Sequence, residues 1–413
     1  MKPHDIIVIG AGIVGVSTAL ALQMKGRSVC ILDRSGVAAE ASRGNAGAFA
    51  FADIIPLATP GIMRKAPKWL LDPMGPLSIP PAYALKIAPW MLRFWRASWA
   101  DRYGAAVTAQ ADLMALSRSA LVRQIAATKG ADLIRQDGQL ELYEGERAFR
   151  AGQAGWAQRR AHGIAATPLQ SPEAIAAIQK GLHRRFTHAM FTPDWMSTTD
   201  PRVWTDHLAQ QFCQGGGVIA QADVRSVAQN GDIVTLTTAN DPIHAKNVVI
   251  AAGAWSHHLA ATMGDRIPLE TERGYNTTLP AGAFDLRTQL TFGGHGFVVT
   301  KIGDGVRVGG AVELGGLKRA PTYKRADILL RKAAQFLPEL NTNGGAQWMG
   351  FRPSMPDSLP VIGRSARCDK VHYAFGHGHL GLTQAAGTAE IIAALVTHTV
   401  APILTSPYAP TRF

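Results

Sequence analysis

The chain has 413 residues, 47% of them hydrophobic and 17% charged, which excludes a disordered chain and predicts two lobes rather than one core. Lys and Arg (42) outnumber Asp and Glu (30), and the formal net charge of +12 favours anionic partners such as phosphates, carboxylate substrates and acidic lipid surfaces. Basic and aromatic residues are not interleaved as in nucleic-acid-binding modules, so no nucleic acid is expected as a partner.

Three cysteines, Cys30, Cys213 and Cys368, lie far apart and form no CxxC pair. This spacing argues against a disulfide framework or a zinc site, so we expect three buried thiols, no metal and a reducing, cytoplasmic compartment. No apolar run reaches the roughly 18 residues that span a bilayer, and the glycines of the apolar N-terminus do not suit a signal peptide.

The first forty residues predict a dinucleotide-binding unit. A β-branched run at residues 5–9 predicts a strand buried on both faces, and a small-residue helix follows from about Ile13 to Lys25, with Gly26 as its cap. Residues 27–32 predict a second strand. The turn between the first strand and the helix has the spacing G-x-G-x-x-G, formed by Gly10, Ala11, Gly12, Ile13, Val14 and Gly15.

Each part of this unit has a physical reason. Gly10 permits a tight turn, Gly12 lets the backbone approach a pyrophosphate, and Gly15 lets helix and sheet pack closely. The helix N-terminus adds partial positive charge. Asp33, followed by Arg34, closes the second strand, where a carboxylate accepts hydrogen bonds from ribose hydroxyls. FAD and NAD both use this unit, so the motif alone leaves the choice open.

A second glycine-containing loop favours FAD. It is formed by Ser42, Arg43, Gly44, Asn45, Ala46 and Gly47. A long FAD that lies across the domain needs more backbone amides than a nicotinamide site does. An ordinary loop is the alternative interpretation.

The cofactor-binding domain is expected to resume late in the chain, after an intervening lobe. Asp200 and Pro201 predict the start of a helix that ends at residues 215–217. A small-residue turn at 251–256 follows the last predicted strand. The strands in this region are predicted around residues 218–220, 224–227, 233–238 and 247–250.

Over nearly its whole length the chain resembles the glycine oxidase/D-amino-acid oxidase flavoprotein superfamily. It is most similar to the bacterial D-amino-acid dehydrogenase branch of the small-subunit type. The resemblance rests on the N-terminal glycine unit, the loop at 42–47, the turn at 251–253 and two C-terminal blocks. The more specific block is RPSMPDSLPVIG at residues 352–363, and the other is GHGHLGLT at residues 376–383.

The resemblance implies an α/β fold of two lobes. One is a Rossmann-like FAD-binding domain, and the other is a substrate-binding domain with a mixed or antiparallel sheet. Alternating apolar and polar residues at 138–144 and 275–314 suit such a sheet, and His295 is expected in one of its turns, where it either faces the substrate or simply forms the turn. We expect the FAD-binding domain at 1–55, 195–262 and 346–413, and the substrate-binding domain at 56–194 and 263–345.

Arg352 is the principal candidate for substrate binding. A guanidinium holds a carboxylate with two parallel hydrogen bonds, which fix orientation as well as charge. The resemblance implies that Arg352 pairs with the substrate carboxylate while the Cα–H points at flavin N5; a structural salt bridge is the alternative. Tyr275 is expected either to cap the substrate or to be a buried structural tyrosine. Many relatives have a lysine where Arg273 stands, so no role of that lysine is carried over.

The block at 376–383 predicts a flexible turn that runs into a helix from Thr383 to about Val396. The helix N-terminus would stabilise negative charge at the flavin C2 carbonyl. His377 and His379 are acid/base candidates, but hydride transfer from a neutral amine needs no side-chain base, so we expect them to contact the flavin or shape the loop. Further FAD contacts are implied at Val224, Ala252, Gly253, Trp255, Gly378, Leu380, Gly381, Leu382 and Thr383.

FAD is expected to be non-covalent. Sarcosine-oxidase-like relatives attach FAD through a cysteine slightly upstream of their Pro-Asp pair. Residues 348–351 contain no cysteine here, and Cys368 lies beyond the block.

Residues 54–103 are dense in Pro, Trp and Leu, notably at Trp69–Pro73 and Pro89–Arg96. The resemblance implies an apolar, arginine-edged surface that rests on a membrane and meets a quinone. The alternative is a lobe that packs against its neighbour.

The expected reaction is the oxidation of a D-amino acid by hydride transfer from the α-carbon, giving an imine that water hydrolyses to a 2-oxo acid and ammonia. D-proline or cis-4-hydroxy-D-proline would stop at the cyclic imine. A quinone or another carrier would reoxidise the flavin in the cytoplasm or on the cytoplasmic face of a membrane. Alternatives are a glycine- or sarcosine-type oxidase that uses oxygen, a non-catalytic flavin-binding subunit and an NAD dehydrogenase.

Overall fold

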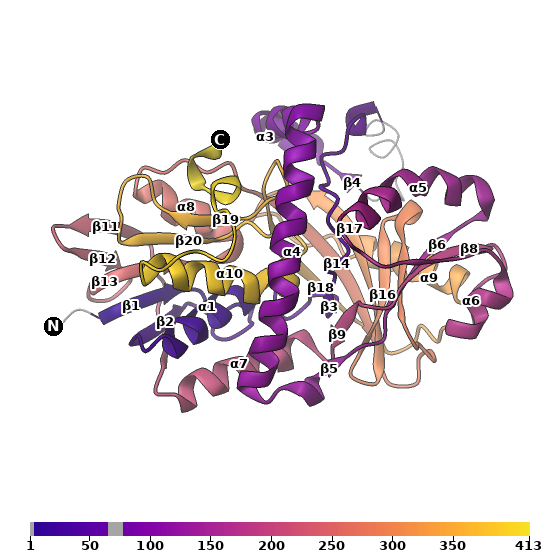
Figure 1. Cartoon of the computed structure of the whole chain (residues 1–413), viewed down its shortest axis with the longest axis horizontal. Helices are drawn as coiled ribbons and strands as arrows, with labels where there is room; N and C mark the ends of the chain where they lie inside the picture. Colours follow the sequence, from indigo (N-terminus) through magenta and orange to yellow (C-terminus); the bar gives the residue numbers. More distant parts are fainter. Residues whose placement is uncertain (1–3, 65–76) are drawn as a thin grey trace.

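The computed structural model describes residues 4–64 and 77–413. An eight-stranded sheet with its helices forms the left lobe in Figure 1, and a nine-stranded sheet forms the right lobe. The predicted two-lobe α/β fold is therefore confirmed. The predicted apolar stretch Trp69–Pro73 lies outside the described residues.

The eight-stranded sheet has the predicted dinucleotide-binding unit at its centre. Strand β1 (His4–Ile9), helix α1 (Ile13–Met24) and strand β2 (Val29–Asp33) follow in order. β1 lies between β2 and β13 (Ile243–Ile250) and runs parallel to both. The other strands of this sheet are β10 (Val218–Gln221), β11 (Ser226–Asn230), β12 (Ile233–Thr237), β19 (Val361–Arg364) and β20 (Val371–Phe375).

The central strands of this sheet are buried on both faces. Ile6 and Val8 of β1 join one hydrophobic core, whereas Ile7 and Ile9 join the core on the opposite face. Such two-sided burial is typical of parallel strands covered by helices. The first core is covered by α1, α4 (Ala100–Thr128), α7 (Pro201–Gln214) and α10 (Gly381–Val396), and the second by α8 (Ser256–Thr262).

Two local predictions in this lobe are confirmed, and one is wrong. Asp200 caps α7, because its Oδ1 accepts hydrogen bonds from the backbone N–H groups of the next two non-proline residues at 2.7 and 3.3 Å. The C-terminal helix is also present, beginning at Gly381 rather than Thr383. Cys30 and Cys368 are buried, but Cys213 is exposed because it lies on the solvent side of α7.

The nine-stranded sheet is built around β14 (Glu270–Leu279), which pairs antiparallel with β17 (Gly305–Leu314) and β18 (Ala346–Ser354). Residues 346–413 were expected with the FAD-binding domain, but β18 belongs to this sheet, and the chain returns to the other sheet only at β19. The remaining strands are β4 (Leu77–Ser78), β6 (Gln139–Tyr143), β7 (Thr167–Leu169), β8 (His188–Thr192), β15 (Gln289–Phe292) and β16 (Phe297–Ile302).

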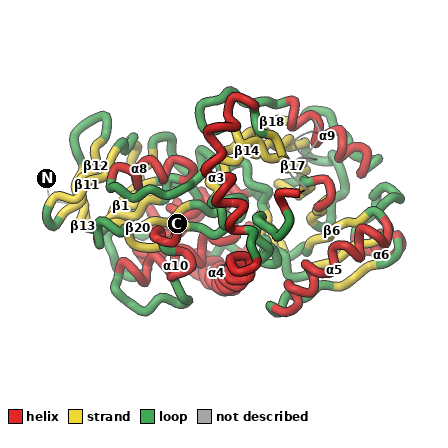
Figure 2. The backbone as a smooth tube through the Cα atoms, turned by 90° about the horizontal axis from the view of Figure 1, so that it is seen from above, coloured by secondary structure: helices red, strands yellow, loops and turns green. Residues whose placement is uncertain are grey.

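Helix α4 connects the two lobes. The expected boundaries placed it in the substrate-binding domain, but its Leu113, Leu116 and Leu121 pack into the core of the eight-stranded sheet. Figure 2 shows α4 end-on beside α10, with β6 and α5 (Gly145–Ala161) on the other side. A small sheet of β3 (Ala48–Phe49), β9 (Met196–Thr198) and β5 (Ile134–Arg135) lies to the right of the lower half of α4 in Figure 1.

Among the remaining helices, α3 (Ala84–Ala97) lies beside the upper end of α4, and the others belong to the right lobe (Figure 1). Helix α9 buries Leu329, Ala333 and Phe336 in the core of the nine-stranded sheet. No helix among the described residues is both long and apolar enough to cross a membrane. The helices are α3 (Ala84–Ala97), α5 (Gly145–Ala161), α6 (Pro172–Ile178) and α9 (Lys324–Phe336).

Candidate active site

A cavity of about 780 Å³ lies where the two lobes meet. Its walls come from the turn between β1 and α1, the loop at 42–47, the segment after β13, strands β14, β17 and β18, and the loop before α10. The volume is within the usual range for a cavity that holds a cofactor or a small ligand, about 300–1,000 Å³.

The N-terminus of α1 faces this cavity. Gly12 is the N-cap residue and provides no side chain to cap the first turn, and Gly12, Ile13 and Val14 all line the cavity. Ser42 enters the same turn, because its hydroxyl accepts a hydrogen bond from the backbone N–H of Ile13 at 2.9 Å. Free N–H groups in the first turn of a helix suit a pyrophosphate.

Asp33 lies at the end of β2 in the cavity wall, as predicted. Its Oδ2 accepts from the backbone N–H of Ala11 at 2.8 Å, and its Oδ1 accepts from the N–H groups of Ser35 and Gly36 at 2.7 and 2.9 Å. These bonds hold the carboxylate at the cavity edge. The helix N-terminus, the glycine turn and this acid together fit the dinucleotide part of FAD.

Most of the predicted cofactor residues line the cavity, and four do not. Gly15 instead packs α1 against β1: a β-carbon there would lie 1.9 Å from the Gly10 carbonyl oxygen. Gly47 adopts a φ of +78° and donates its N–H to Asn45 Oδ1 at 2.9 Å. The residues outside the cavity lining are Ala11, Gly15, Arg43 and Gly47.

The loop at 42–47 accepts hydrogen bonds from two side chains that were not predicted from the sequence. Arg307 of β17 donates to the carbonyl oxygen of Asn45 and, at 2.9 Å, to the hydroxyl of Thr278. Asn276 of β14 donates to the Gly44 carbonyl oxygen at 2.9 Å. In β17 Arg307 stands between two valines, an alternation that points to it but does not say which face meets the cavity. Asn276 has no such signal, because the residues from Asn276 to Thr278 are all polar.

Arg352 lines the cavity from β18. Its Nη1 donates to the carbonyl oxygen of Ala311 at 3.3 Å, and no carboxylate of a described residue lies within 4.0 Å of its guanidinium. Burial lowers its pKa, opposed by the charge of Glu272, yet an arginine stays protonated in proteins. The alternative of a structural salt bridge is therefore not supported.

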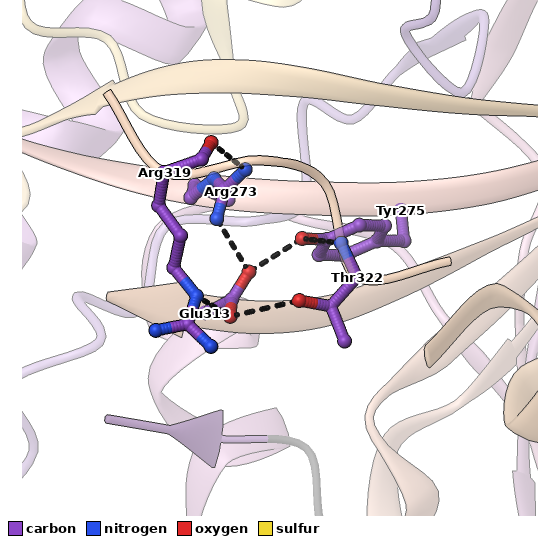
Figure 3. Close-up of polar contacts among 5 residues, drawn as sticks. All are labelled: Arg273, Tyr275, Glu313, Arg319 and Thr322. Atoms are coloured by element: carbon purple, nitrogen blue, oxygen red, sulfur yellow. Dashed lines mark hydrogen bonds and ion pairs between the residues drawn. The ribbon is translucent and has the colours of Figure 1, made fainter. Parts of the chain in front are cut away.

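Tyr275 borders the cavity, and its hydroxyl takes part in a buried cluster of hydrogen bonds. The hydroxyl donates to Glu313 and accepts from the backbone N–H of Thr322 at 3.1 Å. Glu313 also pairs with Arg273 at 2.9 Å (Figure 3). This buried cluster corresponds to the second alternative for Tyr275, a structural tyrosine.

The two predicted histidines differ in their surroundings. His377 is buried, with Nε2 2.9 Å from the Thr388 hydroxyl, and burial lowers its pKa to about 3, so it is neutral near pH 7 and a poor acid/base candidate. His377 and His379 both line the cavity, and His379 is the more exposed of the two, with Nε2 3.0 Å from Asp53 Oδ2. Burial alone would raise the pKa of Asp53, but His379 and Arg159 lower it below its ordinary value.

Two further predictions concern side chains near the cavity. His295 forms the end of a turn and lies 2.8 Å from Glu144, so it has the turn role rather than a substrate contact. None of the three cysteines lines the cavity. A thioether link to FAD therefore has no nearby thiol within the described residues, and non-covalent FAD stays the prediction.

The chain is similar to proteins that are named as amino-acid oxidases and dehydrogenases. It is 33% identical to a D-amino-acid oxidase of Bradyrhizobium diazoefficiens and 29% identical to D-amino acid dehydrogenase 1 of Mesorhizobium japonicum, with 99% of each chain covered in both cases. A crystal structure of glycine oxidase from Geobacillus kaustophilus has a TM-score of 0.80 at 19% identity, over 100% of both chains.

The family comparison covers nearly the whole chain. The FAD dependent oxidoreductase family (DAO) matches residues 5–395, which include both the dinucleotide-binding turn and Arg352. The glycine turn, the acid at the end of β2 and the cavity give this match a physical basis. The chain therefore belongs to the DAO family of FAD-dependent oxidoreductases.

Proposed function

We propose that this enzyme oxidises a small D-amino acid at its α-carbon, with Arg352 as the residue that binds the substrate carboxylate. The observation that carries the proposal is a guanidinium in the cavity wall whose one described hydrogen-bond partner is a carbonyl oxygen. A partly buried cation of this kind is partly desolvated, at a cost that a bound carboxylate would offset. The D configuration is supported by the names of the relatives.

Some residues of the cavity would bind FAD, and Arg352 would orient the substrate. FAD, when bound, supplies a two-electron acceptor for the hydrogen on the α-carbon. The α1 N-terminus and Asp33 would hold its pyrophosphate and ribose. Arg352 would hold the substrate carboxylate bidentately and so fix the direction of the α-carbon. Water would then hydrolyse the released imine to a 2-oxo acid and ammonia.

The electron acceptor of the proposal is a quinone or another carrier. Helix α3 supports this version, because Leu85, Leu92 and Trp95 are exposed beside Lys86 and Arg93, a combination that suits an anionic membrane surface. D-proline and cis-4-hydroxy-D-proline are the narrower substrate candidates. A solved structural relative is named L-proline dehydrogenase from P. horikoshii, at a TM-score of 0.76 and 19% identity, which is a likeness of fold.

The first test is anaerobic bleaching of the flavin absorption band of the FAD-loaded protein. Rapid bleaching is expected with one or more D-amino acids, and not with their L-enantiomers, glycine or sarcosine. Arg352→Ala should keep FAD and lose about 100- to 1,000-fold in bleaching efficiency, since truncating one partner of a buried charge pair costs roughly 3–4 kcal/mol. Bleaching by L-amino acids or sarcosine alone would contradict the D-amino-acid assignment.

An oxygen-using oxidase is the second candidate, because one relative at 33% identity is named D-amino-acid oxidase. The same D-substrates would bleach the flavin in this case. Stoichiometric hydrogen peroxide during turnover in air would support the oxidase, and turnover that depends on an added quinone would support the dehydrogenase.

A further inference from the structure

Strand β17 contains a β-bulge beside the cavity. The register between β14 and β17 shifts between Arg273 and Tyr275, so that the single residue Gly274 faces two residues of β17, Ala311 and Val312. Ala311 has a φ of +54°, in the left-handed region that residues with a β-carbon seldom adopt. Bulges of this kind redirect groups next to active sites.

The bulge forms the seat of Arg352. The carbonyl oxygen of Ala311 accepts the hydrogen bond from Nη1 of Arg352 at 3.3 Å. The guanidinium occupies the space above Gly274, where a β-carbon would lie 2.4 Å from Cζ. Both contacts depend on backbone placement, and so the direction of Arg352 depends on the bulge keeping its shape.

The Glu313 carboxylate contacts both residues that flank Gly274, from the face of the sheet opposite to Arg352. The residues on either side of Gly274, Arg273 and Tyr275, both bind Glu313, the former at 2.9 Å (Figure 3). The side chains are almost fully buried, with exposed fractions of 0% for Arg273, 1% for Tyr275 and 3% for Glu313. The cluster also holds the segment after β17, because Arg273 Nη2 donates to the Arg319 carbonyl oxygen at 2.8 Å.

We propose that Glu313 is a positioning residue for substrate binding: it fixes the bulge of β17 and thereby the direction in which Arg352 presents its guanidinium. The inference rests on the proposed function, in which Arg352 binds the substrate carboxylate. A strained backbone persists only where its surroundings over-determine it, and Glu313 supplies two of the contacts that do so. Relaxation of the bulge would move the Ala311 carbonyl away from Arg352.

The test measures the affinity of the FAD-loaded protein for benzoate, a carboxylate that cannot be oxidised at an α-carbon, through the shift of the flavin absorption band. Glu313→Gln keeps the shape of the side chain and removes its charge. We expect benzoate affinity to fall by about 10- to 100-fold, because a misplacement of about 1 Å has effects of this size, while FAD remains bound. In an Arg352→Ala background the same substitution should have no further effect.

Asp265→Asn is the matched control. Asp265 is also a buried carboxylate that accepts from a tyrosine hydroxyl, here Tyr373 at 2.6 Å, and from Ser365, but it lies in the other lobe and does not line the cavity. Its loss should lower the melting temperature and leave benzoate affinity unchanged. Equal effects of the two substitutions on benzoate affinity would show general destabilisation and overturn the proposal.

Two further variants keep the proposal testable if Glu313→Gln does not fold. Tyr275→Phe removes one contact of Glu313, and Ala311→Gly relieves the strained φ. Tyr275→Phe should weaken benzoate binding, whereas Ala311→Gly suits the left-handed φ of the bulge and should leave benzoate affinity unchanged without lowering the melting temperature. Unchanged benzoate affinity in Tyr275→Phe would overturn the positioning role alone. If Arg352→Ala itself leaves benzoate affinity unchanged, the role of Arg352 in the proposed function fails as well.

Discussion

Two arginines on opposite faces of the nine-stranded sheet, Arg273 of β14 and Arg352 of β18, are held in different ways. On the rear face, Arg273 donates to the Glu313 carboxylate and to the carbonyl oxygen of Arg319. On the cavity face, the described partner of Arg352 is the carbonyl oxygen of Ala311. Burial of a guanidinium is costly unless an anion accompanies it. The difference indicates that the charge of Arg273 is neutralised by a carboxylate of the protein itself. The charge of Arg352 is instead available to a bound anion, such as the substrate carboxylate.

The largest expected difference in stability comes from replacing each of the two arginines by methionine. Arg273→Met should lower the free energy of unfolding by about 3 kcal/mol, because it removes the fully buried cation that pairs with Glu313 and leaves the carboxylate with the half-exposed Arg319 at 3.5 Å. Arg352→Met should be neutral or stabilising, since it removes a desolvated charge that has no carboxylate partner, while substrate oxidation is lost. Chemical denaturation of the FAD-free proteins measures both changes. Equal destabilisation by the two substitutions would contradict the distinction between the two arginines.

A smaller effect is expected from filling the space under Arg352. Gly274→Ala places a methyl group where the guanidinium lies, so the arginine must move and the KM for the amino acid should rise about tenfold, or roughly 1.4 kcal/mol. Steady-state kinetics with the best D-substrate measures it. Gly104→Ala, in the exposed part of α4 with no atom within 4 Å of the added carbon, is the control and should leave KM unchanged. An unchanged KM in Gly274→Ala would mean that Arg352 is not the carboxylate site.

The sequence predicts some of this arrangement because part of it is local. The glycine turn and Asp33 are recognisable because strand, turn, helix and strand follow one another within forty residues. Arg352 is predictable because its motif is continuous in the chain. The sequence left the role of Tyr275 open between a substrate contact and a structural tyrosine. Neighbouring residues of a strand point to opposite faces, and the sequence does not show whether Gly274 or Tyr275 is on the cavity face.

The other half of the site is not local. Glu313 lies 40 residues from Arg273, and Arg307 lies 262 residues from Asn45. Their pairing depends on strand register and on a bulge, which alternation of apolar and polar residues does not encode. The domain boundary near residue 346 was misplaced for the same reason, since nothing in the local sequence shows that β18 pairs with β14.

A further effect, of similar size but confined to acid pH, concerns His372, a buried base of the eight-stranded sheet. Neither ring nitrogen of His372 has a hydrogen-bond partner among the described residues, and burial lowers its pKa to about 4. Unlike Arg352, it can lose its proton and remain neutral in the folded state. The unfolded chain takes up a proton on this imidazole near pH 6.5, whereas the folded chain does so only near pH 4. Stability contributed by neutral His372 is therefore complete above pH 6.5 and is lost as the pH falls toward 4.

His372→Leu should make this acid destabilisation shallower. One pH unit below the unfolded pKa, a single such imidazole costs about 1.4 kcal/mol, so the variant should gain roughly that much on the wild type between neutral pH and pH 5.5. Urea unfolding at several pH values measures the difference. Some pH dependence should remain, because His377, whose pKa burial lowers to about 3, is unchanged in the variant. Parallel stability curves for the two proteins would mean that His372 is protonated in the folded state, and that this buried base has an anionic partner as Arg273 does.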